Sequence, residues 1–191
     1  MRKVIVSVET TLNGVMSVAD WSFPYSSKER VDYSRALLFS SDALLMGRET
    51  YEVFATYWPA KMESGDGPGE EGFSERINTI TKYVASTTLK ELTWNNSHLI
   101  KGDVAQEVSK LKQQPGMNIV MYGAGEVAHT LIQHGLIDEV HLMLFPIIAP
   151  VTENSTRLFN DAGDIPILKL METKPTASGI VIHKYQIDGN A

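Results

Sequence analysis

The sequence contains no cysteine among its 191 residues. This absence excludes disulfide bonds, thiolate nucleophiles and metal sites built from cysteine. A chain without cysteine also suits a reducing compartment, and we expect a cytoplasmic protein.

Long apolar runs and an excess of basic residues are also missing. No segment approaches the run of about 18 apolar residues that a membrane-spanning helix requires. The net charge is −6, and lysine and arginine are scattered along the chain, so we expect neither a membrane nor a nucleic acid as a partner. The five histidines do not show the spacing of metal ligands, and no metal site is predicted.

Apolar segments typical of strands alternate with helix-like segments up to about residue 148, and this alternation predicts a parallel sheet wrapped by helices. Strands are expected at 2–9, 43–46, 82–86, 98–100, 118–122 and 140–148. Helices are expected from about Lys28 and at 49–54, 73–80, 103–113 and 126–133. Two more strands, at 167–173 and 180–187, form a C-terminal antiparallel hairpin.

The predicted fold class is therefore α/β, with a mostly parallel central sheet, helices on both faces and a C-terminal antiparallel hairpin. The length fits one domain that spans residues 1–191. Residues 61–72 are rich in glycine and acidic residues, and we expect them to form a surface loop within this domain.

A glycine-rich motif follows one of the expected strands. Residues 123–128 read Gly-Ala-Gly-Glu-Val-Ala and precede the helix expected at 126–133. This pattern matches a turn that binds the pyrophosphate of a dinucleotide, because glycine lets the backbone approach a phosphate and the helix start offers unpaired N–H groups. A tight turn for close packing of the helix on the strand is the structural alternative.

The remainder of a Rossmann unit is missing. Such a unit carries an acidic residue at the end of the next strand, where the residue binds a ribose. Here Asp138 and Glu139 come before the strand expected at 140–148. We therefore predict phosphate binding at residues 123–128 without a Rossmann fold.

A second candidate turn follows the strand expected at 43–46. Gly47 ends that strand, Arg48 adds a positive charge that can pair with phosphate, and Thr50 lies in the first turn of the next helix. A capped helix with a surface arginine explains the same residues without a ligand.

A third candidate turn contains Ser86 and Thr87, whose hydroxyl groups can donate to a phosphate. An ordinary polar turn explains these residues equally well. However, the carboxyl ends of parallel strands lie at one edge of a sheet, where ligands of such folds bind. The three turns together therefore predict one extended ligand with a pyrophosphate and a separate phosphate, and NADPH is such a ligand.

Three segments of the sequence resemble the dihydrofolate-reductase-like family. Residues 42–51 (Asp-Ala-Leu-Leu-Met-Gly-Arg-Glu-Thr-Tyr) resemble its first cofactor segment, and residues 82–89 and 123–140 resemble the second and third. The similarity is greatest to the C-terminal reductase domain of bifunctional riboflavin-biosynthesis enzymes and its stand-alone relatives. It implies a three-layer fold, an NADPH cofactor and a homodimer.

The resemblance also implies a place for each candidate cofactor-binding residue. The pyrophosphate and the adenosine side would be bound by Gly47, Arg48 and Thr50, and the 2′-phosphate by Ser86 and Thr87. The pyrophosphate and the nicotinamide ribose would be bound by Gly123, Ala124, Gly125 and Glu126. The family usually has aspartate where this chain has Asn13, and a glycine-rich turn where this chain has residues 149–154.

The substrate is expected between the loop at 10–25 and the helix that begins near Lys28. Asn13, Trp21 and Tyr25 are the candidate substrate-binding residues, because aromatic rings offer flat apolar walls to a pterin or pyrimidine ring. Ordinary core packing is the alternative for the aromatic rings. Glu9 and Asp32 are the candidate catalytic proton donors, with Glu29 or water as alternatives.

These features favour an NADPH-dependent reductase that acts on a small heterocycle. The substrate would be pterin-like or folate-like, or would resemble 5-amino-6-(5-phosphoribosylamino)uracil. A non-catalytic, dimeric nucleotide-binding protein that keeps the fold is the main alternative, and a flavin-dependent protein is a third.

Overall fold

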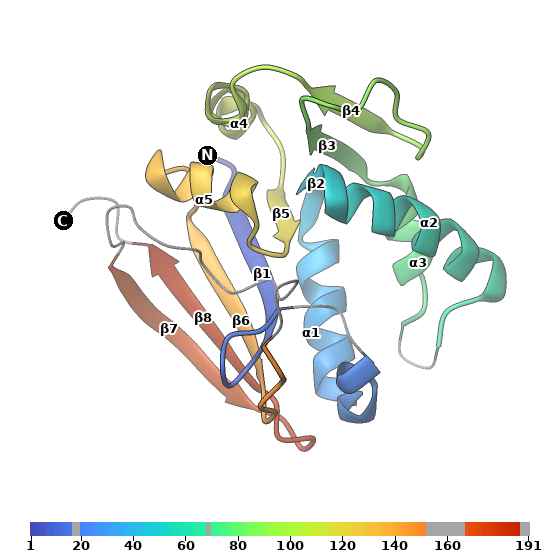
Figure 1. The fold of residues 1–191 in the computed structure, drawn as a ribbon, viewed down its shortest axis with the longest axis vertical. Helices are drawn as coiled ribbons and strands as arrows, with labels where there is room; N and C mark the ends of the chain where they lie inside the picture. The colour runs from blue at the N-terminus through green and yellow to red at the C-terminus, as the bar shows by residue number, and fades with distance from the viewer. Residues whose placement is uncertain (17–19, 68–69, 152–166, 188–191) are drawn as a thin grey trace.

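An eight-stranded sheet forms the centre of the described chain, which comprises residues 1–16, 20–67, 70–151 and 167–187 of a computed structural model (Figure 1). The strands lie in the order β4-β3-β2-β5-β1-β6-β8-β7. They span Val4–Thr11 (β1), Ser41–Gly47 (β2), Thr81–Ala85 (β3), Ser97–Ile100 (β4), Asn118–Tyr122 (β5), Glu139–Phe145 (β6), Leu168–Pro175 (β7) and Val181–Ile187 (β8).

The strands from β4 through β6 are parallel, whereas β8 is antiparallel to both β6 and β7. Most of the connections between the parallel strands contain a helix, as crossovers in such sheets usually do. The α-helices span Lys28–Phe39 (α1), Arg48–Ser64 (α2), Phe73–Thr79 (α3), Val104–Gln113 (α4) and Glu126–Gln133 (α5), and a short 3-10 helix, η1, spans Asp20–Tyr25.

Helices cover both faces of the sheet. On one face, strand residues such as Val6 pack with Val108 of α4 and Leu131 of α5. On the other face, residues such as Leu44 pack with α1, α2 and α3. The hairpin of β7 and β8 extends the sheet on the side away from α2 and α3 (Figure 1). This arrangement confirms the predicted three-layer α/β fold with its C-terminal antiparallel hairpin.

Capping residues determine where two of the helices begin. Ser27 has an extended backbone, and its Oγ accepts a hydrogen bond of 3.3 Å from the N–H of Arg30, which starts α1 as predicted. Asp103 caps α4 in the same way, with a bond of 3.1 Å from the N–H of Gln106. No helix in the described ranges is both long enough and apolar enough to cross a membrane.

The helix α2 is longer than the sequence predicts. A helix at 49–54 and a loop at 61–72 were expected, but α2 continues to Ser64 with Pro59 inside it. Proline removes one hydrogen bond from a helix. The ring of Trp58 packs against a phenylalanine ring of α3 with a centroid separation of 5.2 Å, and this tertiary contact offsets the loss.

Lys82 on β3 is an unusual core residue, because its side chain is fully buried. Its Nζ donates to the backbone oxygens of Asn78, Ile80 and Asn95 at 2.8, 2.8 and 3.0 Å, and it lies 4.3 Å from the ring centroid of Trp94. Burial lowers the pKa of Lys82 to about 8, so the ammonium form still predominates at neutral pH. One buried cation therefore connects the end of α3 to the turn before β4.

We predict that Lys82→Met lowers the free energy of unfolding by about 3 kcal/mol, because three backbone oxygens lose their donor while the side-chain volume changes little. Urea unfolding at pH 7, followed by tryptophan fluorescence, measures the change. Lys110→Met is the control, because Lys110 is exposed on α4 and should contribute little. Equal stability of Lys82→Met and the unmodified chain would contradict the role given to the cation.

Candidate functional site

The three turns singled out in the sequence lie along one edge of the sheet. Gly47 at the end of β2 is paired with Ala85 at the end of β3. The strand β2 is also parallel to β5, which brings the turn at Gly123 towards the same edge. A Cβ atom at Gly47 would lie 3.4 Å from Val127, in the first turn of α5. The starts of α2 and α5 are therefore in contact.

Both of these helices begin without a side-chain cap. Their N-cap residues, Gly47 and Gly125, have extended backbones and form no side-chain cap hydrogen bond. The helices α1 and α4, by contrast, are capped by Ser27 and Asp103. The first N–H groups of α2 and α5 are therefore available to an anion, which the helix dipoles also attract.

A surface cavity of about 320 Å³ lies at the start of α5, and it is lined by Ala124, Gly125, Glu126, His129 and Thr130. A Cβ atom at Gly125 would meet no heavy atom within 4 Å, so the backbone is open to a ligand on this side.

The turn before this cavity is fixed by Gly123. Its φ of +92° strongly favours glycine, and its N–H donates to the backbone oxygen of Ser7 at 3.0 Å. The sheet thus holds one side of the turn while the other side faces the cavity. A turn that is both rigid and accessible is suited to the backbone binding of a phosphate.

Arg48 and Thr50 lie in the first turn of α2. The Arg48 side chain is 44% exposed and pairs with Glu52 at 3.0 Å and Glu49 at 3.7 Å on the same helix. Exposed pairs of this kind are weak, so a phosphate can replace these carboxylates as the partner of Arg48. Thr50 is half-buried.

The turn after β3 is organised by Ser86. Its Oγ accepts hydrogen bonds of 3.2 and 3.0 Å from the N–H groups of Thr88 and Leu89. Ser86 therefore shapes the turn, and the exposed Thr87 is presented to solvent between Ser86 and Thr88.

Asn13 connects the loop after β1 to the segment after β6. Its Nδ2 donates to the backbone oxygen of Ala149 at 2.7 Å, and its Oδ1 accepts from the N–H of Ala149 at 3.1 Å. The hydroxyl of Thr11 donates to the same Oδ1 at 2.8 Å. The two bonds to Ala149 join the two segments, and the bond from Thr11 holds the Asn13 side chain in place.

The structure describes the side chain of only one of the two aromatic candidates for substrate binding. Tyr25 packs edge-on against Phe145 of β6, with ring centroids 5.9 Å apart, so it covers the sheet beside α1. Trp21 belongs to η1, but its side chain lies outside the described residues.

The two candidate proton donors lie on different sides of α1. Glu9, near the end of β1, accepts hydrogen bonds of 2.8 and 2.9 Å from Arg30, so its carboxylate lies between the helix and the sheet. Asp32 pairs with Lys28 at 2.6 Å on the exposed face of α1. The structure therefore does not bring these two carboxylates together. No group of three or more potential ligands in the described residues is arranged to hold a metal ion.

Beneath α1 lies a row of polar side chains that the sequence analysis missed. Ser7 of β1 is paired with Tyr122 of β5 and with His141 of β6, and His141 is paired with Lys184 of β8. Paired residues of neighbouring strands share a face, so these side chains point the same way. Ser7 and His141 are buried in otherwise apolar strands. Ser7 and His141 interrupt apolar strand sequences, and this could have indicated a buried polar site. The sequence analysis, however, considered the histidines only as metal ligands.

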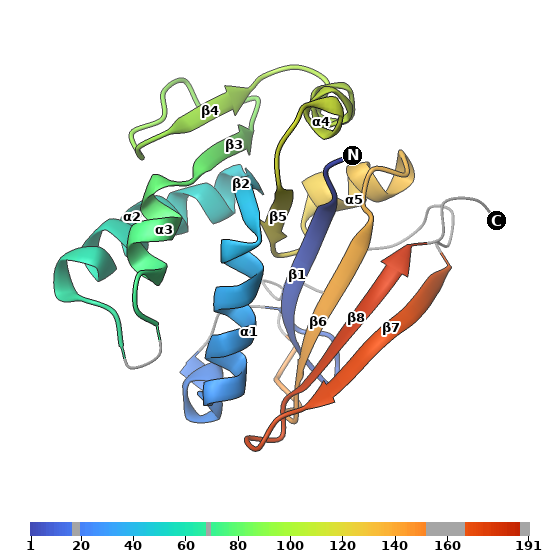
Figure 2. The ribbon, with the colours of Figure 1, turned by 180° about the vertical axis from the view of Figure 1, so that it is seen from behind.

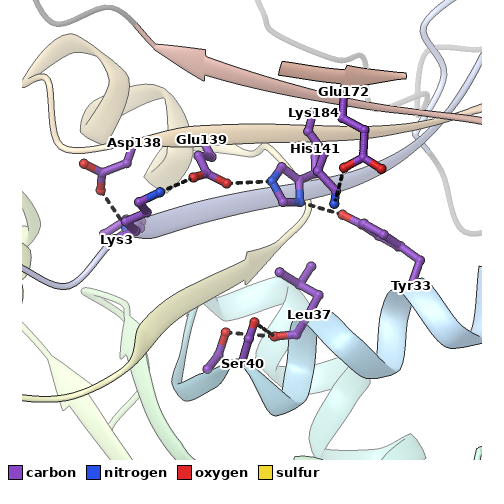
Figure 3. A network of polar contacts seen from close by, with 11 residues as sticks. Lys3, Tyr33, Leu37, Ser40, Asp138, Glu139, His141, Glu172 and Lys184 are labelled. Carbon is purple, nitrogen blue, oxygen red and sulfur yellow. Dashed lines mark hydrogen bonds and ion pairs between the residues drawn. The ribbon is translucent and has the colours of Figure 1, made fainter. Parts of the chain in front are cut away.

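Tyr33 of α1 completes this polar row (Figure 3). Its hydroxyl lies 2.7 Å from Nδ1 of His141, and Nε2 of His141 lies 2.9 Å from a carboxylate oxygen of Glu139. The other oxygen of Glu139 accepts a bond of 2.6 Å from Lys3. Because an ionised carboxylate only accepts hydrogen bonds, Nε2 of His141 carries a proton. In a neutral ring Nδ1 then accepts the proton of Tyr33.

Burial and hydrogen bonding set the protonation of this row. Burial lowers the pKa of His141, although Glu139 opposes the shift. Burial also raises the pKa of Tyr33, which keeps its hydroxyl protonated. Burial alone would raise the pKa of Glu139, but hydrogen bonds from Lys3 and His141 outweigh it and hold the pKa below its usual value. At neutral pH the row therefore contains an ionised glutamate, a neutral histidine and a neutral tyrosine.

Two polar atoms in the same layer have no hydrogen-bond partner within the described residues. They are the hydroxyl of Tyr122 and Nε1 of Trp58, and both are buried. The ring of Phe54 lies 6.0 Å from each of these two rings, so all three belong to the layer between α2 and the sheet. A buried polar atom without a partner costs about 1–3 kcal/mol, and an absent ligand is one explanation for it.

Comparison with known proteins agrees with this architecture. Two solved structures cover nearly the whole chain. A protein from Shewanella sp. PV-4, named for riboflavin biosynthesis, has a TM-score of 0.74 and 21% identity over 97% of this chain and 99% of its own. A pyrimidine reductase-like protein from Corynebacterium diphtheriae has a TM-score of 0.67 and 14% identity over 99% of this chain and 93% of its own. At these identities the likeness shows the fold alone.

A family model identifies the family, and one curated relative is similar over nearly the whole chain. The uncharacterized protein YyaP of Bacillus subtilis (strain 168) is 28% identical over 192 residues, which cover 98% of this chain and 96% of that protein. The family model described as the RibD C-terminal domain matches residues 2–182. As the resemblance of the cofactor segments implied, the chain belongs to the RibD C-terminal domain family.

Proposed function

We propose that this chain is an NADPH-dependent reductase that transfers a hydride to a small heterocyclic substrate. Its family supports a reductase of the riboflavin-pathway type. The main support for an NADPH cofactor is that three turns lie at one edge of the sheet, where α2 and α5 begin without side-chain caps. A ligand with a pyrophosphate and a separate 2′-phosphate has enough anionic groups to contact all three turns.

The proposal gives the candidate residues distinct roles at this edge. The N–H groups that follow Gly47 and Gly125 would bind the pyrophosphate, with Arg48 as the neighbouring cation. The turn at Ser86 and Thr87 would bind the 2′-phosphate. The remaining cofactor contacts are assigned to Thr50, Gly123, Ala124 and Glu126.

The substrate would be a planar heterocycle, either pterin-like or folate-like, or similar to 5-amino-6-(5-phosphoribosylamino)uracil. When bound, NADPH supplies the hydride, and the chain needs to orient the two reactants and exclude water. Asn13, Trp21 and Tyr25 remain proposed substrate-binding residues, and Glu9 and Asp32 remain proposed proton donors. The single domain and the cytoplasmic location also remain predictions.

Fluorescence titration of the chain with NADPH and with NADH tests the cofactor. We expect NADPH to bind with a Kd of about tens of micromolar or less, and NADH to bind more weakly. Loss of NADPH absorbance with 7,8-dihydrofolate or the phosphoribosylaminouracil then tests turnover. Tight NADPH binding without any turnover would favour a non-catalytic nucleotide-binding protein. Absence of NADPH binding would contradict both the reductase and the non-catalytic nucleotide-binding protein.

Gly125→Val is expected to weaken NADPH binding by at least about tenfold. The new side chain would project into space that is open in the structure, so it should block a phosphate without disturbing the fold. Gly125→Ala should have an intermediate effect. Gly102→Val is the control, because a Cβ atom there also meets nothing within 4 Å. Unchanged NADPH affinity in Gly125→Val, with an unchanged melting temperature, would refute backbone binding at this turn.

Thr87→Glu is expected to weaken NADPH binding by about tenfold while leaving NADH binding unchanged, because a carboxylate would repel the 2′-phosphate. Thr87 is exposed, so the substitution should not affect folding. Thr79→Glu is the control, since Thr79 is an exposed threonine at the end of α3, before β3 begins. Equal losses of NADPH and NADH affinity would show that the 2′-phosphate binds elsewhere.

The expected homodimer is also part of this proposal. In Figure 2 β7 forms the outer margin of the sheet, and its Leu170 and Met171 are 52% and 58% exposed. An edge strand with exposed apolar side chains can pair with a second copy of itself. We expect the chain to sediment as a dimer and Leu170→Lys to sediment as a monomer. Met62→Lys on α2 should remain dimeric, and a monomeric unmodified chain would contradict the proposal.

A further inference from the structure

We propose that the hydroxyl of Tyr33 delivers the proton that accompanies hydride transfer, that His141 positions Tyr33 and restores its proton, and that Glu139 stabilises the protonated form of His141. This inference rests on the proposed reductase function and adds a proton donor to it. Three features of the molecule support it: the place of the polar row, the hydrogen bonds that join the row to the surface, and the unpaired hydroxyl beside it.

The polar row lies next to the proposed cofactor turn. Tyr122 directly precedes Gly123, and it is paired with Ser7, which is paired in turn with His141. The side chain of Ser7 lies within hydrogen-bonding reach of the Tyr33 hydroxyl. The end of β5 therefore leads into the proposed dinucleotide turn at Gly123, and its last residue, Tyr122, belongs to the polar row.

The contacts form a continuous path from the surface to Tyr33 (Figure 3). Lys3 is 57% exposed and binds Glu139, which is 22% exposed, whereas the side chain of His141 is only 6% exposed. The half-buried Tyr33 is the other end of this path. Because Glu139 accepts from Nε2 of His141, these hydrogen bonds hold the imidazole ring with Nδ1 towards the Tyr33 hydroxyl.

The hydroxyl of Tyr122 is the second reason to expect a ligand here. Every member of the path from Lys3 to Tyr33 has a hydrogen-bond partner. The buried hydroxyl of Tyr122, in the same row, has none among the described residues. Fully paired networks are the rule in protein interiors, so a polar atom of the substrate is the expected missing partner. The fitting substrate is a planar heterocycle with a hydrogen-bond acceptor next to the carbon that is reduced.

The proposed step reduces a C=N or C=O group of the substrate. The carbon receives the hydride that bound NADPH supplies, and the π electrons move to the nitrogen or oxygen. That atom takes the proton of the Tyr33 hydroxyl, and the Tyr33 oxygen takes the Nδ1 proton of a doubly protonated His141. The products are the reduced substrate and NADP⁺, with His141 left neutral. After the product leaves, a proton from solvent binds the Tyr33 oxygen while the Tyr33 proton passes to the vacant Nδ1, which restores the imidazolium. Glu139 accepts the hydrogen bond from Nε2 throughout.

The direction of the Tyr33 hydrogen bond depends on the charge of His141. Neutral His141 accepts the proton of Tyr33, whereas the imidazolium donates from Nδ1 and leaves the Tyr33 proton available to the substrate. The groups that face His141 are Tyr33 of α1, Ser7 of β1, Glu139 of β6, Lys184 of β8 and Glu172 of β7. The two carboxylates favour the imidazolium, and Lys184 and burial oppose it.

Because the active form has a protonated His141, kcat should fall as the pH rises through the pKa of His141. Burial holds this pKa below its usual value, so the decline should occur on the acidic side of neutrality. His141→Gln removes the titrating group and should give a flat kcat profile over the same range. An identical decline in His141→Gln would overturn the role of His141.

Tyr33→Phe is the main test, with NADPH as cofactor and with 7,8-dihydrofolate and the phosphoribosylaminouracil as substrates. We expect kcat to fall by about 100-fold while the Kd for NADPH stays unchanged. Tyr185→Phe is the matched control, because Tyr185 lies next to Lys184 on β8 and points to the opposite face of the sheet. A kcat for Tyr33→Phe equal to that of the unmodified chain would overturn the proposal and leave the reductase function standing.

Two readouts do not require turnover. The first is the Kd for 2,4-diaminopyrimidine, measured with and without NADPH, which should rise about tenfold in Tyr33→Phe. The second is the NMR titration of the His141 ring, whose pKa should fall further in Glu139→Gln. Failure of the unmodified chain to bind 2,4-diaminopyrimidine, or equal affinity in Tyr33→Phe, would overturn the inference. Failure to bind NADPH while 2,4-diaminopyrimidine still binds would instead overturn the proposed cofactor.

Discussion

The candidate site depends on the parallel pairing of β3, β2, β5 and β1. Parallel strands end at the same edge, so turns that are separated by many residues in the sequence become neighbours there. Glycine is favoured at one of these turns, since Gly123 has a positive φ, and Gly47 lies close to Val127 of α5. As a result, α2 and α5 begin next to each other, and the first N–H groups of both helices lack a side-chain cap. This site requires both segments of the chain.

Much of this edge could be predicted from the sequence, because the signals are local. The alternation of apolar and helical segments predicts a parallel sheet, and the glycine-rich turn at 123–128 lies where the motif predicts, between β5 and α5. The start of α1 at Lys28 was also predicted. The length of α2 could not be predicted, because Trp58 of α2 packs against α3 and this contact stabilises the longer helix. That contact joins two helices, so the local sequence pattern does not show it.

The functional side chains were harder to predict than the turns, for the same physical reason. The sequence marks Asn13 as a candidate for substrate binding, but it does not show that the amide binds the backbone of Ala149, 136 residues further along the chain. Asp32 and Tyr33 are adjacent in α1, yet the first faces solvent and the second faces the sheet. A sequence pattern shows which residues are polar, but helix orientation and strand register decide which of them are buried together.

The two halves of the site meet at the end of β5. On one side of that strand end, Gly123 begins the turn that leads to the anion-accepting start of α5. On the other side, Tyr122 belongs to the polar row that also contains Ser7, His141 and Tyr33. Hydride transfer to a C=N or C=O group needs both a bound anionic cofactor and a proton at the neighbouring atom. The end of β5 leads into the backbone donors at the start of α5, and its Tyr122 lies in the same row as the proposed proton donor. The two requirements can therefore be met at one place.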